Sequence, residues 1–535
     1  MTPQARNSVL GLHMGFVLGI DVGTSWTVGV LVDVMTGRVL ARHVVQYAPG
    51  FSVPDGHPGG AEQDPAVWLD AAMRVSRECA VAATRRRAPL KAVAVSGVNG
   101  GLGIPMDKWG TVLRKALIWL DHRAVAESQE VAKAIGPARI REVTGNDIID
   151  PYFGFVKLVW YMAHEPDLFG RTKMLSTPSG MVVRALTGSH ATDLTSMAAF
   201  GALLDERTWK VDEGMLGELA EIGSRLSGEG LKADPALFGP IVRSDSVIGS
   251  ITPTGAALSG LPEGVPVVVG GMDSALAMLA SGATEPGDNT LIMGTSWSWG
   301  FLQPREQAAH VPRMVRCPYV LRPEDLSFTF GGGAYLGGAA GHWMPQMVTG
   351  ASADTLEREA AMVPPGAGGV TFHPYLMGVR APIWRADVTA AFLGLRADTH
   401  RGHMHRAVLE GAAFLHEECV RSAKGAGAEL APVTTVVDAG TGSTLWRRIV
   451  ADVSRTPLWH LAAFPGTGYG AAMLAALGAG LATEDQVIGW IPQPRTVEPT
   501  QDPAVLKAYG EARSRFWATH RALHGAVGGP ATSGL

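Results

Sequence analysis

The chain has 535 residues, enough for two or more domains, and its 46% hydrophobic and 18% charged residues exclude global disorder. A net charge of −4, with no Lys/Arg-rich block beyond residues 85–87, argues against a nucleic-acid-binding protein. Three widely spaced cysteines, no signal-peptide pattern and no apolar run of about 18 residues predict a cytoplasmic protein without a membrane partner.

The first half alternates predicted strands and helices after a flexible leader at residues 1–14. Apolar runs predict strands at 16–20, 28–32, 93–95 and 266–269. Helices are predicted at 66–83, 156–164 and 181–186, and Asp64 followed by Pro65 is typical of a helix start. A domain boundary is placed near Gly282.

The second half repeats this alternation. Strands are predicted at 290–293, 299–302 and 434–437, and helices at 406–418, 445–453 and 471–477. Residues 525–535 are rich in small residues and predict a flexible tail. The pattern is typical of the α/β class, with predicted domains at 15–282 and 283–524.

One phrase, Gly-Thr-Ser-Trp, occurs twice and each copy lies between two strand-like runs. The copies are Gly23-Thr24-Ser25-Trp26 and Gly294-Thr295-Ser296-Trp297. A tight turn of this kind presents backbone N–H groups and hydroxyls to phosphate oxygens, and Asp21 precedes the first copy where a divalent metal would bind. Either turn alone could also be an ordinary β-turn; the pair predicts that two similar domains bind a nucleotide.

Other patterns are excluded. The chain has no P-loop sequence. Gly466-x-Gly468 is interpreted as a helix start, because no acidic residue follows a clear strand at about 20 positions, as a dinucleotide-binding fold requires. His400, His403 and His405 have no cysteine and no trio of carboxylates nearby, so no metal site is predicted there.

Several ordered motifs resemble the FGGY carbohydrate kinase family, which includes the xylulose, ribulose and glycerol kinases. The most specific segment runs from Ala390 to Glu410, and the resemblance covers about 16–516. The other similar segments are Glu62–Pro65, Trp119–Arg123, Leu186–Gly188, Thr192–Asp193, Gly271–Asp273 and Glu285–Asp288. The resemblance implies an actin-like ATPase fold, with two ribonuclease-H-like domains and a central cleft for ATP and sugar.

The resemblance also implies roles for single residues. Asp273 would accept the proton of the attacking sugar hydroxyl, although the sequence alone favours an N-cap of the helix that follows. Gly440, Gly442 and Ser443 would lie against adenosine, or form a plain strand-to-helix turn capped by Ser443.

The sugar would contact Asn99, Trp119, Asp121 and Tyr152. An indole packs on C–H groups and a carboxylate accepts hydroxyl hydrogen bonds, but core packing competes for Trp119. Tyr152 matches a segment with which glycerol kinases contact substrate, or it belongs to a structural turn at Pro151.

Two departures from the family pattern bear on the activity. Val28 stands where the family usually has Lys or Arg near the γ-phosphate, and loss of such a cation can cost several kcal/mol. Val98-Asn99-Gly100 replaces the longer polar side chains that hold substrate hydroxyls in xylulose and glycerol kinases.

The predicted function is phosphorylation of a small sugar or polyol by ATP with Mg²⁺, with a ketopentose such as xylulose as substrate. The alternatives are a glycerol or other polyol kinase and a catalytically weak sugar- or nucleotide-binding member. The expected partner is the small-molecule substrate, and a homodimer is compatible with the sequence.

Overall fold

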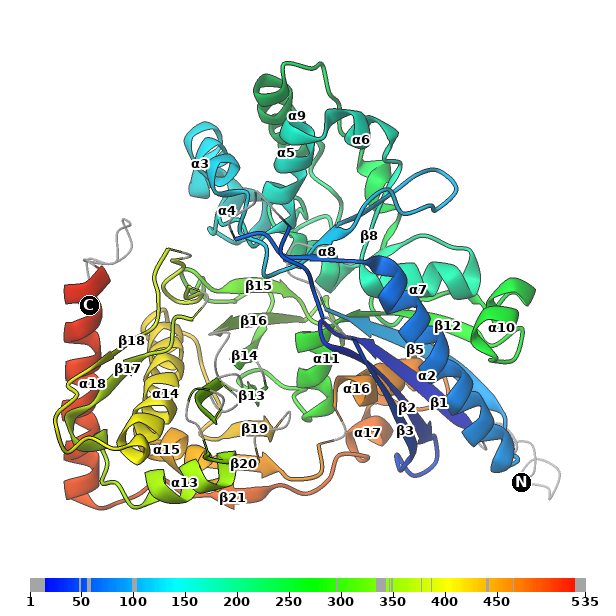
Figure 1. Cartoon of the computed structure of the whole chain (residues 1–535). Coiled ribbons are helices and arrows are strands. Elements are labelled where there is room, and N and C mark those ends of the chain that lie inside the picture. The colour runs from blue at the N-terminus through cyan, green and yellow to red at the C-terminus, as the bar shows by residue number, and fades with distance from the viewer. Residues whose placement is uncertain are drawn as a thin grey trace. The chain divides into compact units, whose positions relative to one another are not determined.

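The computed structural model describes residues 15–47, 50–54, 59–98, 103–294, 297–332, 343–345, 347, 350–376, 378–385, 387–438, 442–464 and 466–524. The chain forms two compact units (Figure 1). The first comprises residues 1–282, 316–327 and 465–491, and the second comprises 283–315, 328–464 and 492–535. Two segments that follow Gly282 in the chain therefore belong to the first unit.

A six-stranded mixed sheet, in the order β11-β12-β5-β1-β2-β3, forms the centre of the first unit. β1 is antiparallel to β2 and parallel to β5, β12 is parallel to β5, and both edge strands are antiparallel to their neighbours. The strands are β1 (Phe16–Val22), β2 (Trp26–Asp33), β3 (Val39–Gln46), β5 (Leu90–Gly97), β11 (Val247–Ser250) and β12 (Pro266–Met272).

Helices cover both faces of this sheet. On one face, a Cβ at Gly29 would contact Val75 of α2 (Pro65–Arg85), beside α7 (Pro178–Thr187). On the other, a Cβ at Gly19 would lie 1.8 Å from the Gly468 carbonyl oxygen of α16 (Thr467–Gly478), which packs on α11 (Asp273–Ala280). α16 therefore approaches β1 more closely than any side chain allows.

The start of α2 has the predicted chemistry. Asp64 is the N-cap and its Oδ1 accepts the Ala66 N–H at 2.9 Å, while Pro65 occupies the first turn.

Shorter elements complete the first unit. α5 (Gly154–His164) packs on α9 (Glu213–Ser227). The remaining helices are α3 (Val125–Ala134), α4 (Gly136–Thr144), α6 (Pro166–Arg171), α8 (Leu194–Phe200), η1 (Pro235–Phe238), α10 (Pro253–Ser259) and α17 (Glu484–Ile488). Two-stranded pairs join β4 (Glu62–Gln63) to β7 (Ala116–Leu117), β6 (Ile104–Met106) to β8 (Met174–Ser176), and β9 (Thr192–Asp193) to β10 (Ile241–Val242).

The second unit repeats the strand topology of the first. Its sheet includes the order β16-β14-β13-β19-β20-β21. The three central strands β13, β19 and β20 are parallel to one another, whereas β14 is antiparallel to β13 and β21 is antiparallel to β20. The strands are β13 (Asn289–Met293), β14 (Trp297–Pro304), β15 (Val315–Pro318), β16 (Leu326–Gly332), β19 (Thr434–Asp438), β20 (Leu458–Leu461) and β21 (Arg495–Val497). The predicted α/β class with two similar domains is confirmed.

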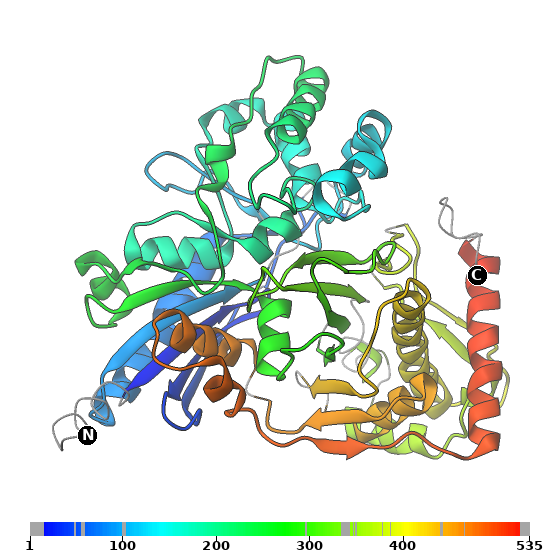
Figure 2. The same ribbon diagram turned by 180° about the vertical axis from the view of Figure 1, so that it is seen from behind.

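The helices of the second unit enclose an aromatic core that includes Trp299, Phe301 and Phe516. Figure 2 shows α14 (Arg401–Gly425, yellow) beside α18 (Pro503–His524, red). The other elements are α13 (Ala353–Ala361), η2 (Ala367–Gly369), α15 (Thr444–Ser454), β17 (Thr371–His373) and β18 (Ala391–Leu393). Throughout the described ranges, no helix combines the length and apolar character needed to cross a membrane.

Candidate active site

The first Gly-Thr turn joins β1 to β2. The Gly23 N–H donates to the Trp26 carbonyl at 2.9 Å, and a Cβ on Gly23 would lie only 3.0 Å from that oxygen. Thr24 is half-buried and Ser25 is exposed. The tight turn and its accessible hydroxyl are of the kind that binds phosphate oxygens.

Asp21 lies at the end of β1, directly beside Ser96 of β5 and Val28 of β2. Its Oδ1 and the Ser96 Oγ are buried, and neither has a hydrogen-bond partner among the described residues. Burial raises the pKa of Asp21 to about 6, opposed by the nearby Ser96 hydroxyl and by the charge of Arg42. Arg42 therefore provides a positive charge that favours the ionised form of Asp21, whereas the neighbouring Val28 carries no charge.

The Asp21 carboxylate fits a ligand of Mg²⁺. An orphaned buried oxygen beside a phosphate-type turn suits this ion, which is usually held by one or two carboxylates together with phosphates and water. Within the described ranges, no group of three or more His, Cys, Asp or Glu residues could hold a metal by itself.

Part of the second predicted phosphate site lies outside the described residues. Gly294 is buried at the end of β13, but Thr295 and Ser296 are not described. In the predicted adenosine loop Gly440 is also outside the described residues, while Gly442 has a φ of +56°. Ser443 caps α15 by accepting the Trp446 N–H at 3.0 Å, which confirms the capping interpretation.

Trp119 contacts the first phosphate turn. Its indole Nε1–H donates to Thr24 Oγ1 at 2.9 Å, and the Gln63 side chain donates to the Thr24 carbonyl at 3.0 Å. The indole is half-buried. A predicted sugar-binding residue and a predicted phosphate-binding residue are therefore joined directly, across 95 positions of sequence.

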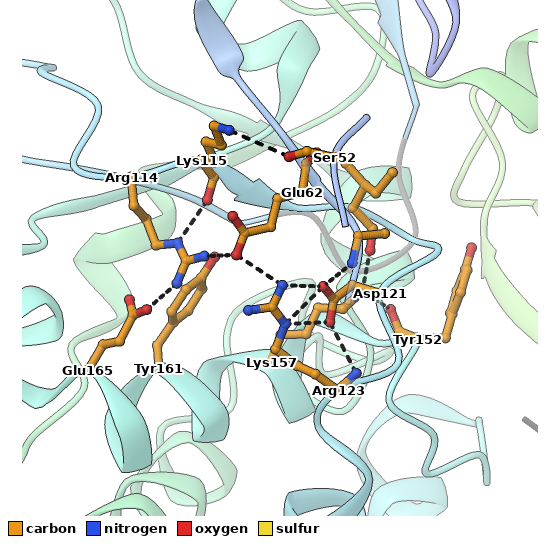
Figure 3. A network of polar contacts seen from close by, with 12 residues as sticks. Ser52, Glu62, Arg114, Lys115, Asp121, Arg123, Tyr152, Lys157, Tyr161 and Glu165 are labelled. Atoms are coloured by element: carbon orange, nitrogen blue, oxygen red, sulfur yellow. Dashed lines mark hydrogen bonds and ion pairs between the residues drawn. The ribbon is translucent and has the colours of Figure 1, made fainter. Parts of the chain in front are cut away.

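Asp121 is fully buried, with 0% of its surface exposed. Its Oδ2 accepts a hydrogen bond from Arg123 Nη2 at 2.7 Å and another from the Ala61 N–H at 2.6 Å. Figure 3 shows the Arg123 guanidinium between Asp121 and Glu62. A sugar hydroxyl would have to displace one of these partners to reach the Asp121 carboxylate.

The ion pairs extend beyond Arg123. Glu62 Oε1 lies 2.9 Å from Arg123 Nη2 and also pairs with Arg114, which in turn pairs with Glu165 (Figure 3). The two arginine side chains are largely buried, at 3% exposure for Arg123 and 13% for Arg114. Removing one partner of such a network would leave a buried charge uncompensated.

Lys157 connects the Trp119 segment to Tyr152. Its Nζ donates to the carbonyls of Ile118 and Tyr152, each at 2.9 Å, and its side chain is almost completely buried (Figure 3). The Tyr152 N–H donates to Asp150 Oδ1 at 2.9 Å, as expected for a structural turn. Tyr152 itself is 8% exposed. Asn99, the remaining predicted sugar contact, lies outside the described residues.

β12 contains a glycine bulge just before Asp273. Its register with β5 shifts between Val268 and Gly271, and Gly270 has a φ of +77°. A Cβ on Gly270 would lie 2.0 Å from the Val95 carbonyl oxygen, so both conformation and space require glycine there.

Asp273 follows this bulge as the first residue of α11 and is half-buried. Met272 holds the N-cap position, so the interpretation of Asp273 as the N-cap is wrong. Asp273 Oδ1 accepts the Ser274 N–H at 2.6 Å.

Asp21 and Asp273 lie at the same edge of the first sheet. β1, β5 and β12 are parallel, and their ends at Val22, Gly97 and Met272 are in register. With one strand between them, β1 and β12 lie about 10 Å apart. Ligands in α/β proteins bind outside this carboxyl edge, so both carboxylates lie at the edge where a ligand is expected.

Five residues that make the contacts described above were given no role from the sequence. They are Glu62, Gln63, Arg114, Arg123 and Lys157. A lysine within the apolar run of α5 is a signal that Lys157 has a specific partner, since nine of the eleven residues of this helix are buried. No comparable sequence signal marks the surroundings of Arg114 as buried.

Comparison with known proteins identifies the family. Residues 16–280 match the N-terminal domain, and residues 290–479 the C-terminal domain, of the FGGY family of carbohydrate kinases. The xylulose kinase of Bacillus subtilis (strain 168) is 28% identical over 473 residues, covering 87% of this chain and 89% of that protein.

Two further relatives agree in length and fold. The glycerol kinase of Myxococcus xanthus (strain DK1622) is 26% identical over 504 residues, covering 91% of this chain and 96% of that protein. The crystal structure of xylulose kinase from Rhodospirillum rubrum has a TM-score of 0.79 at 28% identity, covering 95% of this chain and 99% of that one.

The fold is that of a two-domain α/β kinase. The two family domains span most of the chain, so the protein belongs to the FGGY family of carbohydrate kinases. The resemblance found in the motifs is confirmed, and the protein is a carbohydrate kinase.

Proposed function

We propose that the protein phosphorylates a hydroxyl of a ketopentose such as xylulose, with ATP as donor and Mg²⁺ as the metal. The observation that carries the proposal is the placement of Asp21 and Asp273 at one sheet edge, beside a phosphate-type turn. The substrate class is supported by the xylulose kinases of B. subtilis and R. rubrum, each similar over most of both chains.

In the proposed reaction, Asp273 accepts the proton of a substrate hydroxyl. The hydroxyl oxygen forms a bond to the γ-phosphorus while the bond from that phosphorus to the β–γ bridging oxygen breaks, giving a sugar phosphate and ADP. Asp21 would hold Mg²⁺, which neutralises phosphate charge when bound. Trp119 offers its indole to the sugar while its N–H fixes Thr24 in the phosphate turn.

A glycerol or other polyol kinase is the second candidate. It is favoured by the turn at Asp150, which fixes the backbone of Tyr152, and by the similarity to the M. xanthus glycerol kinase. A third candidate, weak catalysis, rests on the uncharged Val28 beside Asp21.

The proposal is tested by coupled ADP release with Mg²⁺ and ATP against pentuloses, hexuloses, glycerol and tetritols. We expect the highest kcat/KM with a ketopentose, and a loss of about 100-fold or more in Asp273→Asn, because an amide cannot accept the proton. Asp212→Asn is the matched control: Asp212 caps α9 through the Met215 N–H, and asparagine caps equally well. Its other contact is a long surface ion pair with Arg139, at 3.9 Å, whose loss costs little.

Three results would contradict the proposal. Preferred turnover of glycerol would support the second candidate instead. Undiminished turnover in Asp273→Asn would exclude Asp273 as the base. ATP binding without sugar-dependent ADP release would support a catalytically weak member of the family.

A further inference from the structure

A buried hydroxyl binds the main chain next to the candidate base. Thr195 belongs to α8, and 0% of its surface is exposed. Its Oγ1 accepts the backbone N–H of Met272, the residue before Asp273, at 2.9 Å. The contact joins two segments 77 positions apart and holds the Gly271–Met272 peptide, one peptide unit before Asp273.

The direction of these hydrogen bonds is determined by their donors. The Met272 N–H can only donate, so Thr195 Oγ1 is its acceptor. The hydroxyl proton of Thr195 is directed to Asp193 Oδ1, which also accepts the Ser196 N–H at 3.0 Å. Asp193 is 3% exposed, and burial raises its pKa while these donors oppose the rise. The carboxylate thereby orients the hydroxyl, and linked bonds of this kind strengthen one another.

The main chain passes close to this pair. A Cβ on Gly271 would lie 3.0 Å from Thr195 Oγ1, 3.1 Å from Ser244 Oγ and 3.3 Å from Asp193 Oδ1. Glycine at 271 therefore lets β12 lie against these three side chains. Met272 is the N-cap of α11 but makes no side-chain capping bond, so the Thr195 hydroxyl provides an anchor from a separate element.

We propose that Thr195, oriented by Asp193, is a positioning residue that holds the Met272 peptide and thereby aims the Asp273 carboxylate at the substrate hydroxyl. The inference rests on the proposed role of Asp273 as the base. It predicts that Thr195 contributes to the chemical step and little to sugar binding, because the hydroxyl contacts the peptide behind the base.

The test compares Thr195→Val, Thr195→Ser and Thr192→Val in steady-state kinetics with the best sugar of the panel. Valine removes the hydroxyl at nearly constant volume, and we expect kcat to fall about 10- to 100-fold while the sugar KM changes less than about 3-fold. Serine keeps the hydroxyl and should restore kcat to within about 3-fold of the wild type.

Thr192→Val is the matched control. Thr192 is also buried, and its Oγ1 donates to the Phe238 carbonyl at 2.7 Å, so the variant loses one buried hydroxyl hydrogen bond without touching Met272. We expect its kcat to stay within about 3-fold of the wild type. Circular dichroism and thermal unfolding establish that each variant is folded.

The outcomes separate this inference from the function on which it rests. Unchanged kcat in Thr195→Val with an inactive Asp273→Asn overturns the positioning role and leaves the base intact. Equal losses of kcat in Thr195→Val and Thr192→Val, or no recovery in Thr195→Ser, also overturn it. Full activity of Asp273→Asn overturns the proposed base itself, whatever Thr195→Val shows.

Discussion

The buried imidazole of His416 makes the stability of the second unit depend on pH. His416 lies in α14 with 4% of its surface exposed, and its ring packs edge-to-face on Trp297 and Trp299 at centroid distances of 6.5 and 5.9 Å. Its Nδ1 is buried without a hydrogen-bond partner among the described residues. Burial lowers the pKa of His416 from 6.5 to about 3.

The sign and size of the effect follow from this shift. The unfolded chain takes up a proton at His416 below about pH 6.5, whereas the folded chain keeps the ring neutral down to about pH 3. Stability contributed by this residue is therefore present above pH 6.5 and is lost progressively as the pH falls. At pH 5 the loss is about 2 kcal/mol, from 1.5 pH units at 1.36 kcal/mol per unit.

Urea unfolding of the wild type and of His416→Phe at pH 7.5 and 5.0 measures this loss. Phenylalanine keeps the aromatic packing and cannot be protonated, so the wild type should lose about 2 kcal/mol more than the variant between the two pH values. Equal losses in the two proteins would refute the reasoning, because the His416 proton would then bind the folded and unfolded chains alike.

Three further predictions concern the first unit. Gly19→Ala should lower the free energy of unfolding by about 3 kcal/mol, because its Cβ would overlap α16. Gly170→Ala is the control, since the space around Gly170 is open. Equal thermal unfolding midpoints for the two variants would contradict this. Arg123→Met should cost about 3–5 kcal/mol in urea unfolding, because it leaves the buried Asp121 carboxylate without its ion-pair partner. A loss below about 1 kcal/mol would contradict this. Asp21→Asn should abolish Mg²⁺-dependent turnover. The same variant should stabilise the nucleotide-free protein at pH 8 by up to about 3 kcal/mol, because the raised pKa of Asp21, about 6 in the folded chain, costs stability as the pH rises from about 4 to 6. A less stable variant would contradict this.

Local sequence patterns were sufficient for part of the elements and for the family, whereas β3, α9 and α18 were not predicted. Asp64-Pro65 predicts the start of α2, and apolar runs predict the strands on both sides of each Gly-Thr turn, because caps and strand periodicity act between residues a few positions apart. The order of these motifs along the chain also indicated the FGGY family, which the matches to its two domains confirm.

Which groups each site residue contacts was determined by the tertiary structure. Asp121 was expected to face a sugar, but packing encloses it with Arg123. The bonds from Trp119 to Thr24 and from Met272 to Thr195 join segments 95 and 77 residues apart. No local pattern encodes such distances: a hydrogen bond between remote side chains exists only where the packing of helices on the sheet brings both groups out of water and within about 3 Å of each other.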